Sequence, residues 1–204
     1  MIPKAIVFDL GKVLLDFDWQ IAVRRIVARS RRPIDGPAFF TNQLPLILRY
    51  ELGQVSTREM CEALQQATDF LGTAEELRSY FAEIFTEITP MIELHAAFRK
   101  KGLPTYIFSN TNEMAVEHIR ERYPFFAGFN DYIYSYEHGA MKPDAKLYEI
   151  VERKSNRRGG EILYFDDRPE NVEAGAQRGW QAVLHESPEK TLAAVQRLGV
   201  LNNL

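Results

Sequence analysis

The sequence predicts an α/β protein in which a parallel sheet is flanked by helices and a helical region is inserted after the first strand. Three observations lead to this prediction. From about residue 90 onward, short apolar runs alternate with helical patterns, which is typical of βαβ units on a parallel sheet. One more apolar run lies at the N-terminus, and the stretch between contains helical patterns but no convincing strand. We therefore expect an α/β core of residues 1–16 and 90–204 and a helical cap of residues 17–89.

The strands are expected where short, mostly apolar runs occur. A strand of a parallel sheet is covered on both faces, so its sequence is a continuous apolar run and not an alternation of apolar and polar residues. The first run is unusual because it ends on a carboxylate, Asp9, with Gly11 two residues later. The runs cover residues 5–10, 105–108, 131–134, 162–165 and 181–184.

Helical patterns lie between the later strands. In one of them, Leu147, Ile150 and Val151 recur on one side of the expected helix. Two others begin with Pro169 and Pro188, and proline is favoured at the first position of a helix. The expected core helices are residues 112–122, 144–154, 169–178 and 188–198.

The cap is expected to consist of helices alone. Proline and glycine interrupt its sequence at intervals and divide it into four helical stretches. Ser56 followed three residues later by Glu59 is a capping-box pattern, which predicts the start of the third helix. The expected cap helices are residues 19–28, 37–48, 57–68 and 74–88.

Composition excludes several classes of protein. The chain of 204 residues is 46% hydrophobic and 26% charged, as in ordinary globular proteins. Its formal net charge of −3 and pI of about 5.9 argue against a broad nucleic-acid-binding surface. No apolar run approaches the roughly 18 residues that a membrane span needs, so we expect neither nucleic acid nor membrane as a partner. With one cysteine, Cys61, and no signal-peptide pattern, the expected location is cytoplasmic.

Polar and charged residues follow the apolar runs, at the ends where open parallel sheets bind ligands. Because the carboxyl ends of parallel strands meet at one edge of the sheet, we expect these side chains to converge. They are Asp9 and Gly11 after the first run, Ser109 and Asn110 after the second, Lys142 in the loop after the third, and Asp166 and Asp167 after the fourth.

Such a group of residues supports phosphoryl-transfer chemistry. Carboxylates that meet at one point repel each other unless a cation is present, and Mg²⁺ commonly takes one or two carboxylates together with a substrate phosphate. One carboxylate can then attack phosphorus and form an aspartyl-phosphate. Ser109 and Asn110 can donate hydrogen bonds to phosphoryl oxygens, and the Lys142 ammonium can neutralise both nucleophile and phosphate.

Four segments resemble, in this order, the motifs of the haloacid dehalogenase-like (HAD) hydrolases, specifically the phosphatase branch with a helical cap after the first strand. The resemblance covers nearly the whole chain and implies a Rossmann-like parallel sheet flanked by helices, with an inserted helical cap. The Asp-Leu-Gly opening and the Phe-Asp-Asp segment are similar to the sugar-phosphate phosphatase group that includes α-glucose-1-phosphate phosphatase. The four segments are FDLGKV at 8–13, FSNT at 108–111, KP at 142–143 and FDDRPEN at 165–171.

The resemblance implies a Mg²⁺ site. Asp9 would be both the nucleophile and a metal ligand, Gly11 would offer its backbone carbonyl, and Asp167 would be the second direct carboxylate ligand. Asp166 and Asn171 would hold the waters of the metal ion.

The resemblance also implies how the substrate is bound. Ser109 and Asn110 would bind the phosphoryl group, and Lys142 would bridge it and Asp9. Asp9, Ser109 and Lys142 are therefore the expected catalytic residues, and a small phosphorylated metabolite is the expected partner. The sequence does not predict the oligomeric state.

Gly11 departs from the pattern, because most phosphatases of this superfamily have a second aspartate there. That aspartate protonates the leaving group and then activates water, which is typically worth about 10²–10⁴ in rate. Asp16 or Asp18 could supply the proton instead. In the other interpretation, Asp18 caps the helix that starts at Trp19 and Asp16 is a turn residue.

The leading hypothesis is a Mg²⁺-dependent phosphatase of a small phosphorylated metabolite such as a sugar phosphate, acting through an aspartyl-phosphate on Asp9. One alternative is a 2-haloacid dehalogenase, which needs no leaving-group acid, although the pair Asp166 and Asp167 would repel its anionic substrate. Another is a binding or regulatory protein with weak catalysis, because the usual second aspartate is Gly11.

Overall fold

The core of the molecule is a five-stranded parallel sheet with strand order β5-β4-β1-β6-β7. The structure is a computed structural model that describes residues 2–201, apart from the side chains of residues 36, 37 and 40. Each predicted strand is present within one or two residues of its expected ends, so the α/β prediction is confirmed. The strands are β1 (Ala5–Phe8), β4 (Thr105–Ser109), β5 (Asp131–Tyr134), β6 (Ile162–Asp166) and β7 (Gln181–Leu184).

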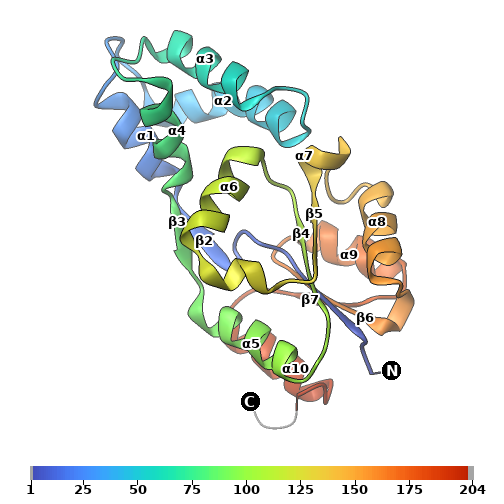
Figure 1. Cartoon of the computed structure of the whole chain (residues 1–204). Helices are drawn as coiled ribbons and strands as arrows, with labels where there is room; N and C mark the ends of the chain where they lie inside the picture. Colours follow the sequence, from blue (N-terminus) through green and yellow to red (C-terminus); the bar gives the residue numbers. More distant parts are fainter. Residues whose placement is uncertain (1, 202–204) are drawn as a thin grey trace.

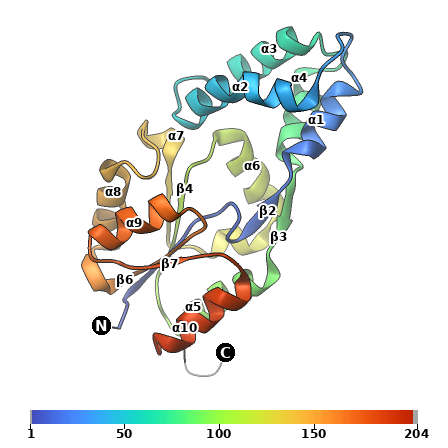
Figure 2. The same ribbon diagram turned by 180° about the vertical axis from the view of Figure 1, so that it is seen from behind.

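Helices cover both faces of this sheet (Figures 1 and 2). One face carries α5 (Thr89–Lys100), α6 (Glu113–Arg122) and α10 (Pro188–Arg197), and the other carries α8 (Ala145–Ser155) and α9 (Pro169–Gln177). The predicted core helices are thus all present.

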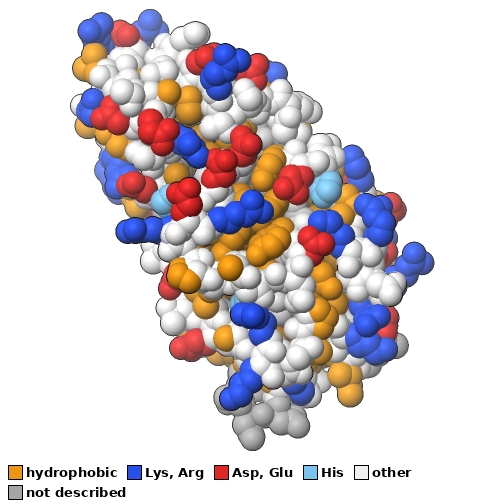
Figure 3. All heavy atoms as spheres, in the orientation of Figure 1, with side chains coloured by type: hydrophobic (Ala, Val, Ile, Leu, Met, Phe, Trp, Pro, Cys, Tyr) orange, Lys and Arg blue, Asp and Glu red, His pale blue; other side chains and the backbone are white. Residues whose placement is uncertain are grey.

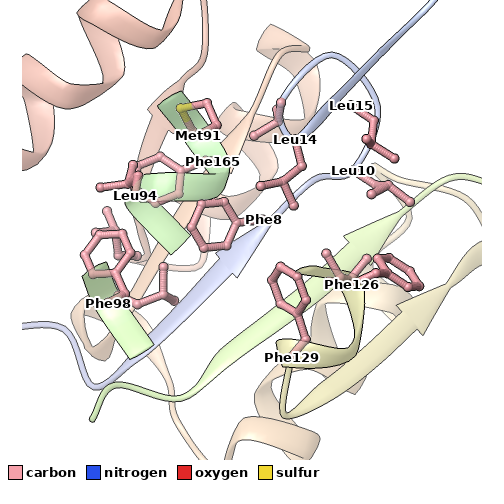
Figure 4. Close-up of a cluster of buried hydrophobic side chains, with 14 of the residues drawn as sticks. Phe8, Leu10, Leu14, Leu15, Met91, Leu94, Phe98, Phe126, Phe129 and Phe165 are labelled. Atoms are coloured by element: carbon pink, nitrogen blue, oxygen red, sulfur yellow. The ribbon is translucent and has the colours of Figure 1, made fainter. Parts of the chain in front are cut away.

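The central strand β1 is buried on both sides. Ile6 and Phe8 pack into the cluster under α5, whereas Ala5 and Val7 pack into the cluster under α8. The Phe8 ring lies against Phe165 of β6, with ring centroids 5.1 Å apart (Figure 4). This double burial explains why the strand reads as an uninterrupted apolar run.

Four helices form the inserted region at one end of the molecule (Figure 1). They enclose an apolar cluster that Met114 of α6 also joins, and the predicted capping box of Ser56 and Glu59 is present at the start of the third helix. That residues 17–89 form a separate domain stays a prediction. The helices are α1 (Trp19–Val27), α2 (Gly36–Glu51), α3 (Thr57–Thr68) and α4 (Ala74–Ala82).

Two short strands at the boundaries of the insert correct the sequence prediction. β2 (Leu15–Phe17) pairs with β3 (Phe85–Glu87) in an antiparallel ribbon, so the expected absence of strand from residues 17–89 is wrong. The expected helix over 74–88 is also too long, because it ends at Ala82. Pairing with a segment 70 residues away in sequence overrides the local helical pattern.

Two further features bear on the site. Helix α2 extends one turn beyond its predicted end and finishes at Glu51, and a short helix α7 (Ser135–His138) follows β5. Two 3₁₀ turns complete the chain's regular structure in the described range, at Pro124–Gly128 and Gly159–Glu161.

The surface is of mixed charge. On the face shown in Figure 3, basic and acidic side chains are interspersed. Within residues 2–201, no helix is both long enough and apolar enough to cross a lipid bilayer.

Candidate active site

The strand ends bring three carboxylates together. In the sheet register, Phe8 lies beside Phe165, so Asp9 follows β1 where Asp166 ends β6, and the Asp9 amide donates to the Phe165 carbonyl at 2.8 Å. Asp9, Asp166 and Asp167 each offer a carboxylate oxygen, and these oxygens lie within 4.8 Å of one another. Such a cluster of hard oxygen donors suits a divalent cation such as Mg²⁺.

Lys142 stands beside this cluster and is almost completely buried. Its ammonium lies 3.0 Å from Asp9 Oδ1 and 2.6 Å from Asp166 Oδ2, and it donates to the Phe108 carbonyl at 2.8 Å. Burial disfavours the charge on Lys142, but the two carboxylates outweigh it and raise its pKa. Lys142 therefore stays protonated in contact with Asp9.

The cluster carries more negative charge than one lysine neutralises. Burial raises the pKa of the Asp9 carboxyl to about 7 against the opposing effect of Lys142. Burial and the neighbouring Asp166 also raise the pKa of Asp167. A bound cation would favour the ionised form of both groups, since an opposite charge nearby stabilises a carboxylate.

Asp166 is held in place by donors on both of its oxygens. Its Oδ2 accepts hydrogen bonds from Lys142 and the Tyr164 hydroxyl, and its Oδ1 accepts from the Arg168 amide and the Asn171 side chain, each at 2.9 Å. Burial opposes ionisation of Asp166, but Lys142 outweighs it and lowers the pKa. These bonds fit the role of orienting other groups better than that of a direct metal ligand.

Asn171 provides the test of whether a hydrated metal fits here. Its amide nitrogen donates to Asp166, while its Oδ1 is buried without a hydrogen-bond partner in the part of the chain that the structure describes. A buried amide oxygen without a partner is costly, and a metal-bound water would satisfy it. The residues present therefore fit the predicted ion.

Asn110 has a structural role that the sequence did not predict. Both ends of its side-chain amide bind the backbone of Lys142, with Asn110 Oδ1 accepting from Lys142 N at 2.7 Å and Nδ2 donating to Lys142 O at 3.1 Å. Asn110 thus holds the loop that carries the lysine. Its expected contact with a phosphoryl group stays a prediction.

A cavity of about 430 Å³ opens over the carboxylate cluster. It unites residues of the sheet edge with residues of the cap. From the core it is lined by Asp9, Gly11, Lys12, Ser109, Asn110, Met141, Lys142, Asp167, Arg168 and Asn171, and from β2 and the cap by Phe17, Trp19, Leu44, Ile47, Leu48 and Glu51.

The two candidate substitute acids lie elsewhere. Asp18 caps α1, accepting from the Gln20 amide at 2.8 Å, as the other interpretation of this residue expected. Asp16 is exposed and pairs with Lys12, whose hydrogen bond lowers the pKa of Asp16. Neither is among the residues that line the cavity in the described structure, and a role for either as an acid stays a prediction.

Sequence reasoning missed Glu51. This residue is the last of α2 and lines the cavity from the cap side. Burial raises the pKa of Glu51 to about 7, while the charge of Arg168 opposes the shift. A prediction that extended α2 by one more turn would have placed Glu51 on the same helix face as Leu44 and Leu48.

A side chain at Gly11 would have to displace the ring of Phe17. A Cβ atom on Gly11 would lie 2.8 Å from Cε1 of Phe17, closer than carbon atoms approach without one of them moving. The next residue, Lys12, has a φ of 59°, in the left-handed region. The chain therefore makes a tight turn around the space where a second aspartate would be expected.

Comparisons with known proteins agree with this geometry. A family model described as haloacid dehalogenase-like hydrolase matches residues 3–179. D-ribitol-5-phosphate phosphatase of Bacteroides thetaiotaomicron is 26% identical over 208 residues, covering 98% of both chains.

Two solved structures share the fold. A HAD family enzyme from Bacteroides thetaiotaomicron, in complex with magnesium and inorganic phosphate, has a TM-score of 0.78 at 19% identity, covering 89% of this chain and 93% of that one. A HAD-like family hydrolase from Porphyromonas gingivalis has a TM-score of 0.80 at 22% identity, covering 99% of this chain and 100% of that one.

Proposed function

The chain belongs to the haloacid dehalogenase-like hydrolases, and we propose that it is a Mg²⁺-dependent phosphatase that hydrolyses a small phosphomonoester through an aspartyl-phosphate on Asp9. The observation that carries this proposal is the meeting of three carboxylates with Lys142 at one sheet edge. Their oxygens lie within 4.8 Å of one another, and the Lys142 ammonium is 3.0 Å from Asp9.

Asp9 and Asp167 would hold the metal ion together with the backbone carbonyl of Gly11. Asp166 and the unpartnered Asn171 Oδ1 would orient its waters, and the magnesium and phosphate bound in the related enzyme support this assignment. When bound, the ion screens the repulsion between the carboxylates and the incoming phosphate.

Asp9 would act as the nucleophile. Its Oδ1 accepts from the Leu10 amide at 2.7 Å and from Lys142, and within residues 2–201 no hydrogen bond reaches its Oδ2. This oxygen would bond to phosphorus as the ester P–O bond breaks, and water would then release phosphate from Asp9. Lys142, with Ser109 at the same edge, would stabilise the charge on the phosphoryl oxygens during both steps.

A sugar phosphate or polyol phosphate is the proposed substrate class. The cavity of about 430 Å³ is in the range of small-molecule sites, and the phosphatase similar to this chain is named for D-ribitol 5-phosphate. The cap contributes an aromatic and aliphatic wall, Trp19 with Leu44 and Leu48, which would lie against the carbon skeleton of the substrate.

The test is a phosphate-release assay on sugar phosphates and polyol phosphates with Mg²⁺. We expect at least one of them to be turned over, and activity to be lost with EDTA and restored by added Mg²⁺. Asp9→Asn should abolish turnover, since an amide cannot form the aspartyl-phosphate. Undiminished activity of this variant would refute the mechanism, and halide release from a 2-haloacid without metal would favour the dehalogenase alternative.

A further inference from the structure

We propose that Glu51, at the end of cap helix α2, is the general acid and general base of this site and takes the place of the carboxylate missing at Gly11. This inference rests on the proposed phosphatase function. It identifies a cap residue as part of the reaction itself, in addition to the residues on the sheet edge.

The position of the usual acid is occupied by another side chain. A Cβ atom at Gly11 would lie 2.8 Å from the Phe17 ring, and that ring is packed against Trp19 and Phe85, with centroid distances of 5.8 and 6.2 Å. An aspartate at Gly11 would therefore have to displace a packed ring, and with glycine there a proton donor has to come from another residue.

Glu51 is the remaining candidate among the described residues that line the cavity. Asp9 and Asp167 are the proposed metal ligands, Lys142 is paired with Asp9 and Asp166, and the other two titratable groups are cations. Of those cations, Lys12 is paired with Asp16, and Arg168 is paired with Glu170.

Glu51 also lies on the appropriate side of the substrate. In phosphoryl transfer, the attacking and leaving oxygens are roughly in line through phosphorus. With Asp9 attacking from the sheet edge, the leaving oxygen points toward the cap. Glu51 lines the cavity from the cap, and Asp9 lines it from the sheet.

The surroundings of Glu51 suit a group that first gives a proton and then takes one. Burial raises the pKa of Glu51 to about 7, and the facing charge of Arg168 opposes this shift. A catalytic acid is most effective when its pKa lies near the operating pH. The other charged groups around the same cavity are Lys12, Lys142, Asp9 and Asp167.

Contacts between cap and core hold this end of α2 over the site. The hydroxyl of Tyr50, the residue before Glu51, accepts from the Met114 amide of α6 at 3.1 Å. Gly53 has a φ of +67°, and a Cβ atom there would lie 2.2 Å from the Tyr136 carbonyl oxygen of α7. The absence of a side chain at Gly53 therefore lets the end of α2 approach the core closely.

The proposed reaction has two steps, and Glu51 ends them in the protonation state in which it began. In the first, an Asp9 oxygen bonds to phosphorus, the ester P–O bond breaks, and the proton of Glu51 passes to the leaving oxygen. In the second, the Glu51 carboxylate accepts a proton from water, whose oxygen bonds to phosphorus as the Asp9–phosphorus bond breaks. Inorganic phosphate leaves, and Glu51 is protonated again.

The experiment compares leaving groups in wild type and Glu51→Gln. The rate of enzyme phosphorylation is measured in single turnovers with a primary alkyl phosphate and with acetyl phosphate, whose leaving group hardly needs a proton. We expect the variant to lose about 10²-fold or more with the alkyl phosphate and far less with acetyl phosphate. Glu51→Asp should recover part of the alkyl rate. Glu62→Gln, at an exposed position on α3 of the same cap, is the matched control and should behave as wild type.

An equal loss with both substrates, or no loss with either, would overturn the role of Glu51 while leaving the phosphatase intact. If the wild type releases phosphate from no ester, or Asp9→Asn is fully active, the proposed function itself fails. Glu51→Met, which is similar in volume, should show the same pattern as Glu51→Gln, with a large loss on the alkyl phosphate and a small loss on acetyl phosphate. The melting temperatures of all variants show whether they are folded.

Discussion

At Gly11, the aromatic ring of Phe17 lies where a side chain of residue 11 would begin. The phenyl ring fills the space beside Gly11, and Lys12 adds its ammonium 4.6 Å from the centre of the same ring. The resemblance to the HAD phosphatases predicts an aspartate where this chain has Gly11. The sequence could not show that the gap was filled, because the contact depends on the turn between β1 and β2.

Residue patterns predicted that the polar side chains at the strand ends converge. Asp9 and Asp167 lie close together because strand ends in a parallel sheet must meet. The hydrogen bonds of Asn110 to the Lys142 backbone were not predictable in this way. Which of its neighbours an amide selects depends on the path of a loop that no local pattern describes.

Glu51 makes stability depend on pH in a defined direction. Its pKa in the folded chain is about 7, compared with an ordinary value of 4.5, so the folded chain keeps a proton that the unfolded chain has lost. The free energy of unfolding therefore falls as pH rises through this interval. Glu51→Gln removes the effect and should melt at a higher temperature than wild type at about pH 8, with the difference vanishing near about pH 4.

Thermal unfolding of both proteins across this pH range checks the prediction, with Glu62→Gln measured in parallel. A difference that does not change with pH would contradict it.

The end of helix α2 differs from its predicted end, and the difference brings Glu51 to the cavity. The apolar pattern predicts a helix over residues 37–48, and the helix continues to Glu51 before Gly53 ends it. Similarly, the last residues of the expected helix over 74–88 became strand β3. In both places the end of the helix depends on contacts with distant segments. The end of α2 approaches α7, and the segment after α4 pairs with β2.

Gly53→Ala tests whether the end of α2 must approach the core closely. A methyl group would meet the Tyr136 carbonyl at 2.2 Å, so α2 should move away and carry Glu51 with it. We expect a lower kcat with alkyl phosphates and a loss of stability greater than the roughly 1–2 kcal/mol that a left-handed φ costs a residue with a Cβ. Steady-state kinetics and chemical denaturation measure both.

Gly102→Ala is the matched control, since Gly102 has a φ of +77° and, apart from its own chain neighbours, none of the described residues comes within 4 Å of the added Cβ. It should lose stability through backbone strain alone and keep full activity. If Gly53→Ala does no more than this control, the contact with Tyr136 does not position Glu51.

At the scale of the whole molecule, the cap docks on the helix that follows Ser109 and Asn110. Thr57 of α3 donates to Glu113, Arg78 of α4 pairs with Glu117, and Tyr50 binds the first turn of α6. The cavity is therefore completed by two parts of the chain. The order of motifs predicted the sheet-edge half, and the cap half depended on which helix faces point inward.

Metal binding should stabilise the entire fold. A ligand that binds the folded chain and not the unfolded chain adds about 2.7 kcal/mol at 100 times its Kd, which corresponds to several degrees in melting temperature for a chain of this size. We expect saturating Mg²⁺ to raise the melting temperature of wild type and not of Asp167→Asn. Asp69→Asn, which removes a carboxylate of the cap, should respond as wild type does. An equal response from Asp167→Asn would place the ion elsewhere.

The ribbon of β2 and β3 is the covalent connection between the sheet and the cap. Both passages of the chain between sheet and cap run through it, hydrogen-bonded side by side from Leu15 with Glu87 to Phe17 with Phe85. Because the two crossings are paired with each other, neither can shift without the other. A displacement of the cap would therefore have to bend these six residues together and also break the contacts of the cap with α6.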